Sequence, residues 1–135
     1  MIKSYLKKII AQSEEDLKII SACCSEGKVK ISDIKYLKKN KIFLISINRF
    51  IKESEKSKNR ANSIIKFEYI QSSKSKNIDQ KNQNKELELI SIDIFKKNNI
   101  FEIILLFLNN KIITLNAEII EVTLEDQKNI NDKIN

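Results

Sequence analysis

Few side chains in this sequence could do chemistry, because the 135 residues include no histidine, two cysteines and two arginines, Arg49 and Arg60. Arg49 is the leading candidate. Lysine greatly outnumbers arginine in this chain. A guanidinium is retained most readily where an ammonium cannot replace its planar, bidentate geometry. Alternation along a strand would place Arg49 on the same face as Phe43, Ile45 and Ile47.

Two hypotheses follow for Arg49. In the first, its guanidinium fixes the packing of strands by bridging a carboxylate, and the candidates are Glu68, Glu121 and Asp126. In the second, Arg49 recognises an anionic ligand or partner together with its neighbours, which makes the partner-binding residues Asn48, Arg49 and Phe50. The sequence leaves both hypotheses open.

Two other clusters are explained by ordinary structural roles. Residues 14–16, Glu-Glu-Asp, offer three oxygen donors, but acids in the first turn of a helix suit its positive end, and we predict no metal site there. Cys23 and Cys24 lack further cysteine or histidine ligands for zinc. We expect them to be small apolar residues, buried or half-buried, with a redox role as the alternative.

Enzyme activity is not expected. The carboxylates of Asp93, Glu118 and Glu121 belong to separate segments, and a general acid and base among them is left open. The chain has no histidine, no glycine-rich phosphate loop and no serine or cysteine beside a recognisable base. We therefore predict no catalytic residue, no cofactor and no metal.

The formal net charge is +7, which raises the question of a nucleic-acid or anionic-surface partner. The lysines are scattered along the whole chain. Because A/T-rich codons favour lysine over arginine, codon usage is the simpler explanation for the excess of lysine, and we expect these side chains to form a solvated surface. The alternative is a binding face made by residues 52–60 and 74–85 with an exposed aromatic such as Phe50 or Tyr69. Lysines spread around a neutral apolar groove would instead favour a protein partner.

One helix is predicted near the N-terminus, over residues 14–25. Ser13 is the expected N-cap, and Leu17, Ile20 and Cys24 recur at helical spacing. Gly27, the only glycine, follows the helix and is expected to cap it with a positive φ.

Most of the remaining chain has the period of two that is typical of strands. The predicted strands cover residues 29–36, 42–50, 63–73, 87–95, 101–108 and 111–115. The strand over residues 101–108 is apolar on both faces and is expected to be central. Turns are predicted at residues 39–40, 97–99 and 109–110, where asparagine tolerates left-handed backbone.

Three polar or ambiguous segments complete the pattern. Residues 52–59 are expected to form an exposed loop and residues 72–85 a mobile one. Residues 117–126 fit a short helix about as well as a strand.

Together these elements predict an α+β fold that is predominantly antiparallel β. We expect a single-domain roll or open barrel of about six strands over residues 1–126, with one helix in the N-terminal region and a short C-terminal helix as one alternative. A pleckstrin-like barrel is one such topology. Residues 127–135 are predicted to form a flexible tail. Neither a membrane-spanning apolar run nor a signal peptide is recognised, so we expect a cytoplasmic protein without membrane insertion.

Several stretches together resemble a family of small uncharacterised bacterial proteins that share a domain of unknown function. The matching residues, in chain order, are Glu14-Glu15-Asp16-Leu17, Ile20-Ser21-Ala22, Asp33, Asn48-Arg49-Phe50, Phe67-Glu68, Ser75, Ile78, Leu89-Ile90-Ser91-Ile92, Leu115, Ile120-Glu121 and Leu124-Glu125-Asp126. The family typically has an aromatic residue soon after Asn-Arg-Phe, a glycine-rich turn where this chain has Asn109-Asn110-Lys111, and a tryptophan after the final aspartate. The chain lacks all three.

The resemblance implies a fold and a compartment but no activity. From the residues themselves we expect a non-enzymatic cytoplasmic binding or adaptor module that acts through a protein partner. The alternative is a weak nucleic-acid or anionic-surface binder that uses its lysine-rich loops.

Overall fold

The computed structural model describes residues 7–51 and 60–127. These residues form ten strands, one α-helix and two short 3₁₀ segments. The strands are β1 (Lys8–Ala11), β2 (Lys28–Lys30), β3 (Ile34–Leu37), β4 (Ile42–Phe50), β5 (Arg60–Phe67), β6 (Ile70–Lys76), β7 (Glu86–Lys97), β8 (Ile100–Phe107), β9 (Lys111–Ala117) and β10 (Val122–Asp126). The helix α1 spans Glu14–Cys24, and the 3₁₀ segments are η1 (Ile31–Asp33) and η2 (Lys38–Asn40).

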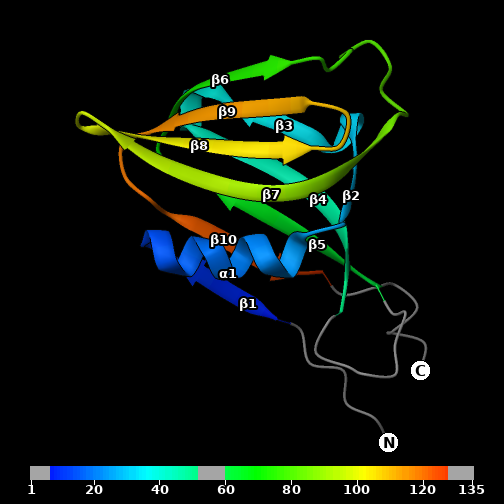
Figure 1. Ribbon diagram of the computed structural model, residues 1–135, viewed down its shortest axis with the longest axis horizontal. Helices are drawn as coiled ribbons and strands as arrows, with labels where there is room; N and C mark the ends of the chain where they lie inside the picture. Colours follow the sequence, from blue (N-terminus) through cyan, green and yellow to red (C-terminus); the bar gives the residue numbers. More distant parts are fainter. Residues whose placement is uncertain (1–6, 52–59, 128–135) are drawn as a thin grey trace, which may run out of the picture.

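All the strands belong to one antiparallel sheet with the order β1-β10-β5-β4-β2-β7-β8-β9-β6. Strand β3 pairs with β4 beside this path, so β4 has β5 along one side and both β2 and β3 along the other. The sheet is rolled into two layers, with β7, β8, β9 and β6 in front of β3, β4 and β5 (Figure 1). The roll is open because β3 and β6, which face each other, are not paired strands.

Helix α1 packs beneath the roll, against β7, β1 and β4 (Figure 1). The side chain of Ser13 accepts a hydrogen bond from the Asp16 backbone N–H at 3.1 Å, so the predicted N-cap is confirmed. Leu17, Ile20 and Cys24 are buried, as their helical spacing indicates. The helix therefore covers the side of the core that lies opposite the gap between β3 and β6.

Gly27 is structural for a reason that differs from the prediction. Its φ is not positive; Glu26 takes the left-handed conformation instead, with a φ of 70°. A Cβ on Gly27 would lie 2.5 Å from Ile47 Cδ1 and 2.8 Å from the Cys24 carbonyl oxygen. Glycine is required here because the chain after α1 passes directly against β4, not because of its backbone freedom.

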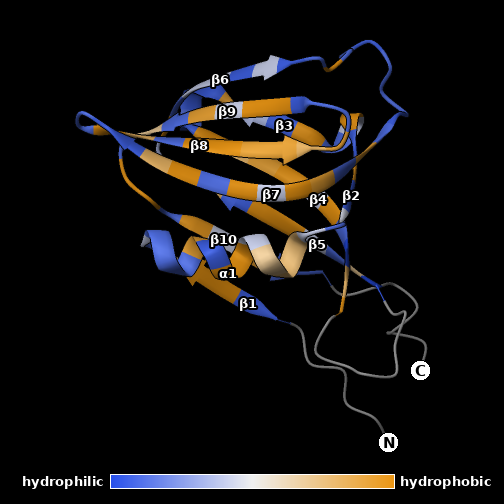
Figure 2. Cartoon of the chain, viewed as in Figure 1, coloured by the Kyte–Doolittle hydropathy of each residue, from blue (hydrophilic) through white to orange (hydrophobic). Residues whose placement is uncertain are grey.

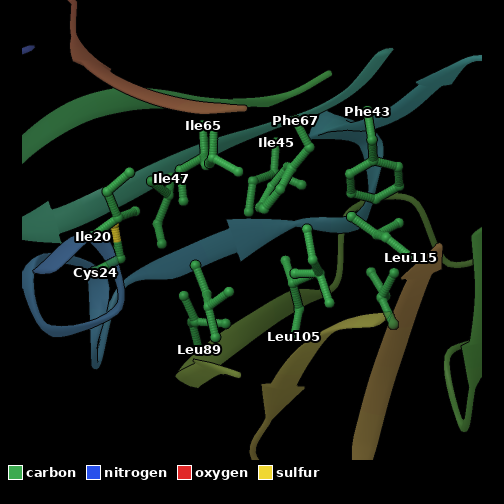
Figure 3. Packing of buried hydrophobic residues seen from close by; sticks show 14 of the residues in the cluster. Ile20, Cys24, Phe43, Ile45, Ile47, Ile65, Phe67, Leu89, Leu105 and Leu115 are labelled. Atoms are coloured by element: carbon green, nitrogen blue, oxygen red, sulfur yellow. The ribbon is translucent and has the colours of Figure 1, made fainter. Parts of the chain in front are cut away.

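The core lies between the two layers of the roll and is filled by alternate residues of the strands. Figure 3 shows Phe43, Ile45 and Ile47 of β4 facing Leu89, Leu105 and Leu115 of the front layer. Hydrophobic residues run along most strands, whereas β6 is largely hydrophilic (Figure 2). The strand predicted to be central, β8, lies between β7 and β9 and is not an edge strand, but it stands third from the β6 end of the sheet order and not at its centre.

The predicted number of strands, about six, was too low. The first reason is that β1, which the sequence did not indicate, pairs with β10. The second is that the stretch predicted as one strand over residues 63–73 is divided into β5 and β6 at Tyr69, whose φ is 60°. The third is that η1 separates β2 from β3 within the predicted strand over residues 29–36. The fourth is that residues 122–126, in the segment that the sequence left undecided, form strand β10.

The structure also corrects the predictions for residues 72–76 and for the C-terminal segment. Residues 72–76 are not part of a mobile loop, because they pair with β9 as the second part of β6. Within the described residues there is no C-terminal helix: residues 122–126 form β10, which fills the gap between β1 and β5. The described part of the chain therefore lacks the terminal helix of a pleckstrin-like barrel.

The asparagine turns are confirmed. Asn98, Asn109 and Asn110 adopt φ values of 59°, 67° and 58° in the β7–β8 and β8–β9 hairpins. The left-handed conformation costs asparagine less free energy than most other non-glycine residues, so the hairpins form without glycine. At residues 39–40 the turn is the 3₁₀ segment η2, and Lys41 supplies the positive φ of 57°.

The predicted tail and the loop over residues 52–59 lie outside the described residues, except for Gln127. Its backbone N–H donates to the Asn62 carbonyl at 2.7 Å. No helix in residues 7–51 or 60–127 is long and apolar enough to cross a membrane.

Candidate functional site

The unpaired gap between β3 and β6 forms a groove, which we call the seam groove. It has a volume of about 240 Å³ and opens between two strands that each have one side without a partner strand. Its lining residues come from both strands and from the segments around them: Ile31, Ile34, Tyr36, Phe43, Ser73, Ser75, Ile78, Gln80, Gln83 and Ile113. No charged residue is among them.

Both ends of the seam groove are held by hydrogen bonds. At one end, the Ile70 N–H donates to the Lys41 carbonyl at 2.8 Å and the Tyr36 hydroxyl donates to the Ile70 carbonyl at 3.0 Å. At the other end, the N–H groups of Ile31 and Ser32 donate to the carbonyls of Lys85 and Gln83, both at 3.0 Å. The two walls are therefore fixed at their ends and stay apart in the middle.

An exposed ion pair reinforces the first end. The Lys41 Nζ donates to Glu118 Oε1 at 2.9 Å. The hydrogen bond from Lys41, with further contributions from Gln71 and from the charge of Lys41, lowers the pKa of Glu118. The same hydrogen bond and the charge of Glu118 raise the pKa of Lys41, so both groups stay ionised at neutral pH.

Lysines lie around the seam groove but not in it. The segments that border it, residues 31–40 and 70–85, contain seven lysines and two aspartates. They carry a formal charge of +5 out of the +7 of the chain. Lys35 on β3 and Lys74 and Lys76 on β6 are exposed, at positions that alternate with the groove-lining residues of the same strands. The groove is thus neutral inside and positively charged outside.

Arg49 is buried with 1% of its surface exposed and forms an ion pair with Asp126, one of the three predicted partners. Its Nε donates to Asp126 Oδ1 at 3.1 Å and to Ser63 Oγ at 3.2 Å, and its Nη2 donates to Asp126 Oδ2 at 2.9 Å. The Nη1 donates to the Phe50 carbonyl at 3.3 Å. This bidentate geometry matches the structural hypothesis for Arg49.

Asp126 also accepts hydrogen bonds from groups other than Arg49, and we call Arg49, Ser63 and Asp126 the buried cluster. Its Oδ1 also accepts from the Ser63 hydroxyl at 2.6 Å, and its Oδ2 accepts from the Lys7 backbone N–H at 3.0 Å. Burial by itself would raise the pKa of Asp126. The hydrogen bonds from Arg49, Ser63 and Lys7, together with the Arg49 charge, outweigh burial and lower that pKa below its usual value. These contacts therefore join β4, β5, β10 and the residue that precedes β1 through an ionised carboxylate.

Asn48 and Phe50 lie on the opposite face of β4 from Arg49, because neighbouring side chains of a strand alternate. Asn48 accepts from Arg60 Nε and donates from its Nδ2 to Asn62 Oδ1 at 2.9 Å. The Arg60 guanidinium lies 3.9 Å from the centre of the Phe50 ring. The structure does not bring Asn48, Arg49 and Phe50 to one face, and their role in partner binding stays a prediction.

The other sequence candidates remain apart. Glu118 is paired with Lys41, Glu121 accepts a hydrogen bond from Gln12 at 2.7 Å, and Asp93 accepts one from Ser91 at 3.1 Å. In residues 7–51 and 60–127, no three His, Cys, Asp or Glu side chains are grouped so that they could hold a metal ion. Cys24 is buried and Cys23 half-buried, as expected.

Sequence reasoning missed the seam groove, because an opening between β3 and β6 depends on how the sheet rolls. One signal was present. Ile78 is the one apolar residue in the polar run over residues 72–85, and it packs against the core beside the groove. A single isoleucine in an otherwise polar run indicates that the segment packs against the rest of the protein at that residue.

No curated protein and no solved structure matches this chain. A family model described as "Protein of unknown function (DUF2948)" matches residues 7–133, which is nearly the whole sequence. The expected membership of a family of unknown function is therefore confirmed, and the chain belongs to the DUF2948 family of proteins of unknown function.

Proposed function

We propose that this protein is a non-enzymatic cytoplasmic adaptor that binds an extended segment of a protein partner in the seam groove. The observation that carries the proposal is the groove itself: an uncharged hollow, lined by both apolar and polar side chains, between two strands that each lack a partner on the facing side. A strand edge presents backbone N–H and C=O groups to which another chain can add, and pockets beside it select side chains.

The size of the groove supports a peptide more than a small molecule. Pockets for drug-sized ligands have volumes of about 300 to 1,000 Å³, and the seam groove is smaller. A few side chains of an extended peptide would fill it. The hydrogen bonds at its two ends hold the walls in place before a partner arrives, which reduces the ordering cost of binding.

The test is selection from a library of displayed random peptides, with two variants of the protein as controls. Ser73→Phe places a large ring in the groove, and Ser73→Ala leaves the groove open. We expect selected peptides to bind the native protein and Ser73→Ala and to lose at least tenfold in affinity for Ser73→Phe. Amide NMR shifts caused by a selected peptide should map to β3 and β6. Peptides that bind Ser73→Phe as well as the native protein would refute the proposal.

The alternative function, weak binding of nucleic acid or an anionic surface, is favoured by one observation. Seven lysines lie in the two segments that border the seam groove. Against it, Arg60 is engaged with Asn48 and Phe50, so that guanidinium and ring are already partnered. Scattered lysines give binding without base readout, which weakens steeply with salt. Submicromolar binding to DNA or RNA that persists at about 0.2 M salt would make this alternative the better account.

A further inference from the structure

We infer that the segment bound in the seam groove alternates apolar and acidic residues. This inference rests on the proposed function above and names the chemistry of the partner. It follows from the alternation of side chains on the two walls of the groove.

The inner side of each wall is apolar or small. On β3, Ile34 and Tyr36 line the groove, and on β6, Ser73 and Ser75 line it. Phe43 of β4 contacts Tyr36, with the ring centres 6.3 Å apart, and also lines the groove. Every second side chain of a strand lying between β3 and β6 would point toward these residues. Those side chains should be uncharged, because the groove holds no charged group to match a charge, and apolar ones would pack against Ile34, Tyr36 and Phe43.

The outer side of each wall is basic. Lys35 lies between Ile34 and Tyr36 on β3, and Lys74 and Lys76 alternate with Ser73 and Ser75 on β6. No acidic side chain in the described part of the chain forms an ion pair with Lys35, Lys74 or Lys76. The outward side chains of a bound strand would lie beside these lysines. Glutamate or aspartate at those positions gains attraction from both walls, whereas lysine is repelled.

The probes for this inference are three seven-residue peptides with blocked ends and a fluorescent label. The first alternates valine and glutamate, the second alternates valine and lysine, and the third has the composition of the first with valines and glutamates in two blocks. Binding is followed by fluorescence anisotropy at about 0.05 M and 0.3 M salt, because exposed charge pairs are screened between these concentrations. Affinity for the valine–glutamate peptide should be highest and should fall at the higher salt concentration.

Charge-reversal variants locate the effect. Lys35→Glu and Lys74→Glu should each weaken binding of the valine–glutamate peptide by about fivefold, the size expected for one exposed charge pair that becomes repulsive. Lys18→Glu is the matched control, because Lys18 is exposed on α1 at the opposite side of the roll. The affinity of Lys18→Glu for the valine–glutamate peptide should stay within about twofold of that of the native protein.

The outcomes separate this inference from the proposed function. If the valine–lysine peptide or the block peptide binds as tightly as the alternating acidic one, and Ser73→Phe still abolishes binding, the acidic alternation is wrong and the groove remains a peptide site. If library peptides bind in a groove-dependent way but none of the three probes does, the alternation is also overturned. If binding of every peptide is insensitive to Ser73→Phe, both proposals fail.

Discussion

Replacing Arg49 by lysine tests whether the buried cluster needs a guanidinium rather than only a positive charge. A lysine ammonium could keep one contact with Asp126. It would lose the paired geometry of Nε and Nη2 on the carboxylate, and with it the bonds to Ser63 and the Phe50 carbonyl. Hydrogen bonds contribute about 0.5 to 1.5 kcal/mol each, and about 1.5 to 3 kcal/mol when one partner is charged. Because the remaining contact offsets part of this, we expect Arg49→Lys to lower the free energy of unfolding by about 1 to 3 kcal/mol.

Urea unfolding measures this difference. For small proteins the slope of the unfolding free energy against urea is about 1 to 3 kcal/mol per molar, so the midpoint should fall by roughly 1 M. Arg60→Lys is the matched control, since Arg60 is partly exposed and contacts Asn48 and the Phe50 ring at the surface of the sheet. Its cost should stay below about 1 kcal/mol. Equal midpoints for Arg49→Lys and the native protein, or equal shifts for the two variants, would refute the structural role of Arg49.

Three further predictions concern the pH dependence, the chain crossing after α1 and a hairpin. The folded pKa of Asp126 lies below its unfolded value of about 3.9, so the cluster stabilises the fold fully above that pH, and the stabilisation is lost as pH falls through the folded pKa. Asp126→Asn should therefore lower the free energy of unfolding by about 3 to 5 kcal/mol at pH 7, measured by urea unfolding. The difference in unfolding free energy between this variant and the native protein should shrink below about pH 4. A difference that does not change with pH would contradict this reasoning. Gly27→Ala should lower the free energy of unfolding by about 1 to 3 kcal/mol, because the added Cβ meets Ile47 and a backbone carbonyl. In a double-mutant cycle, adding Ile47→Val should recover part of that loss. Strictly additive effects of the two substitutions would remove the steric explanation. Asn110→Gly should raise the thermal midpoint by stabilising the β8–β9 turn by up to about 1 kcal/mol, since residue 110 has a φ of 58°, and an unchanged or lower midpoint would argue against backbone strain there.

Local patterns predicted much of this fold correctly. The helix begins after Ser13 because a hydroxyl cap and three acids favour that start, and its buried residues recur at helical spacing. The long strands and asparagine turns were predictable because alternation and left-handed backbone are properties of short segments. The burial of Arg49 followed from its place on the apolar face of β4. These features needed no knowledge of distant residues.

Other features were fixed by contacts between distant segments. The sequence could not choose Asp126 among three carboxylates, because the choice depends on β10 lying between β1 and β5. It also could not show that β1 is a strand, since four residues without strong alternation pair only because β10 offers an edge. The need for glycine at residue 27 arises largely from Ile47, twenty residues away in sequence, which makes the two closest contacts to a Cβ built there. In each case the deciding partner lies far along the chain.

The sequence by itself therefore determined the helix, the longer strands, the family and the place of Arg49 on an apolar strand face, because periodicity, capping and motif order are written in neighbouring residues. The tertiary structure alone decided the seam groove. Whether β3 and β6 pair or stay apart depends on how far the twisted sheet rolls before its free strands meet. Here the hydrogen bonds at Ile70 and Ile31 join only the two ends of the gap. The sheet stops short of closure between them, and an uncharged hollow remains within a basic surface.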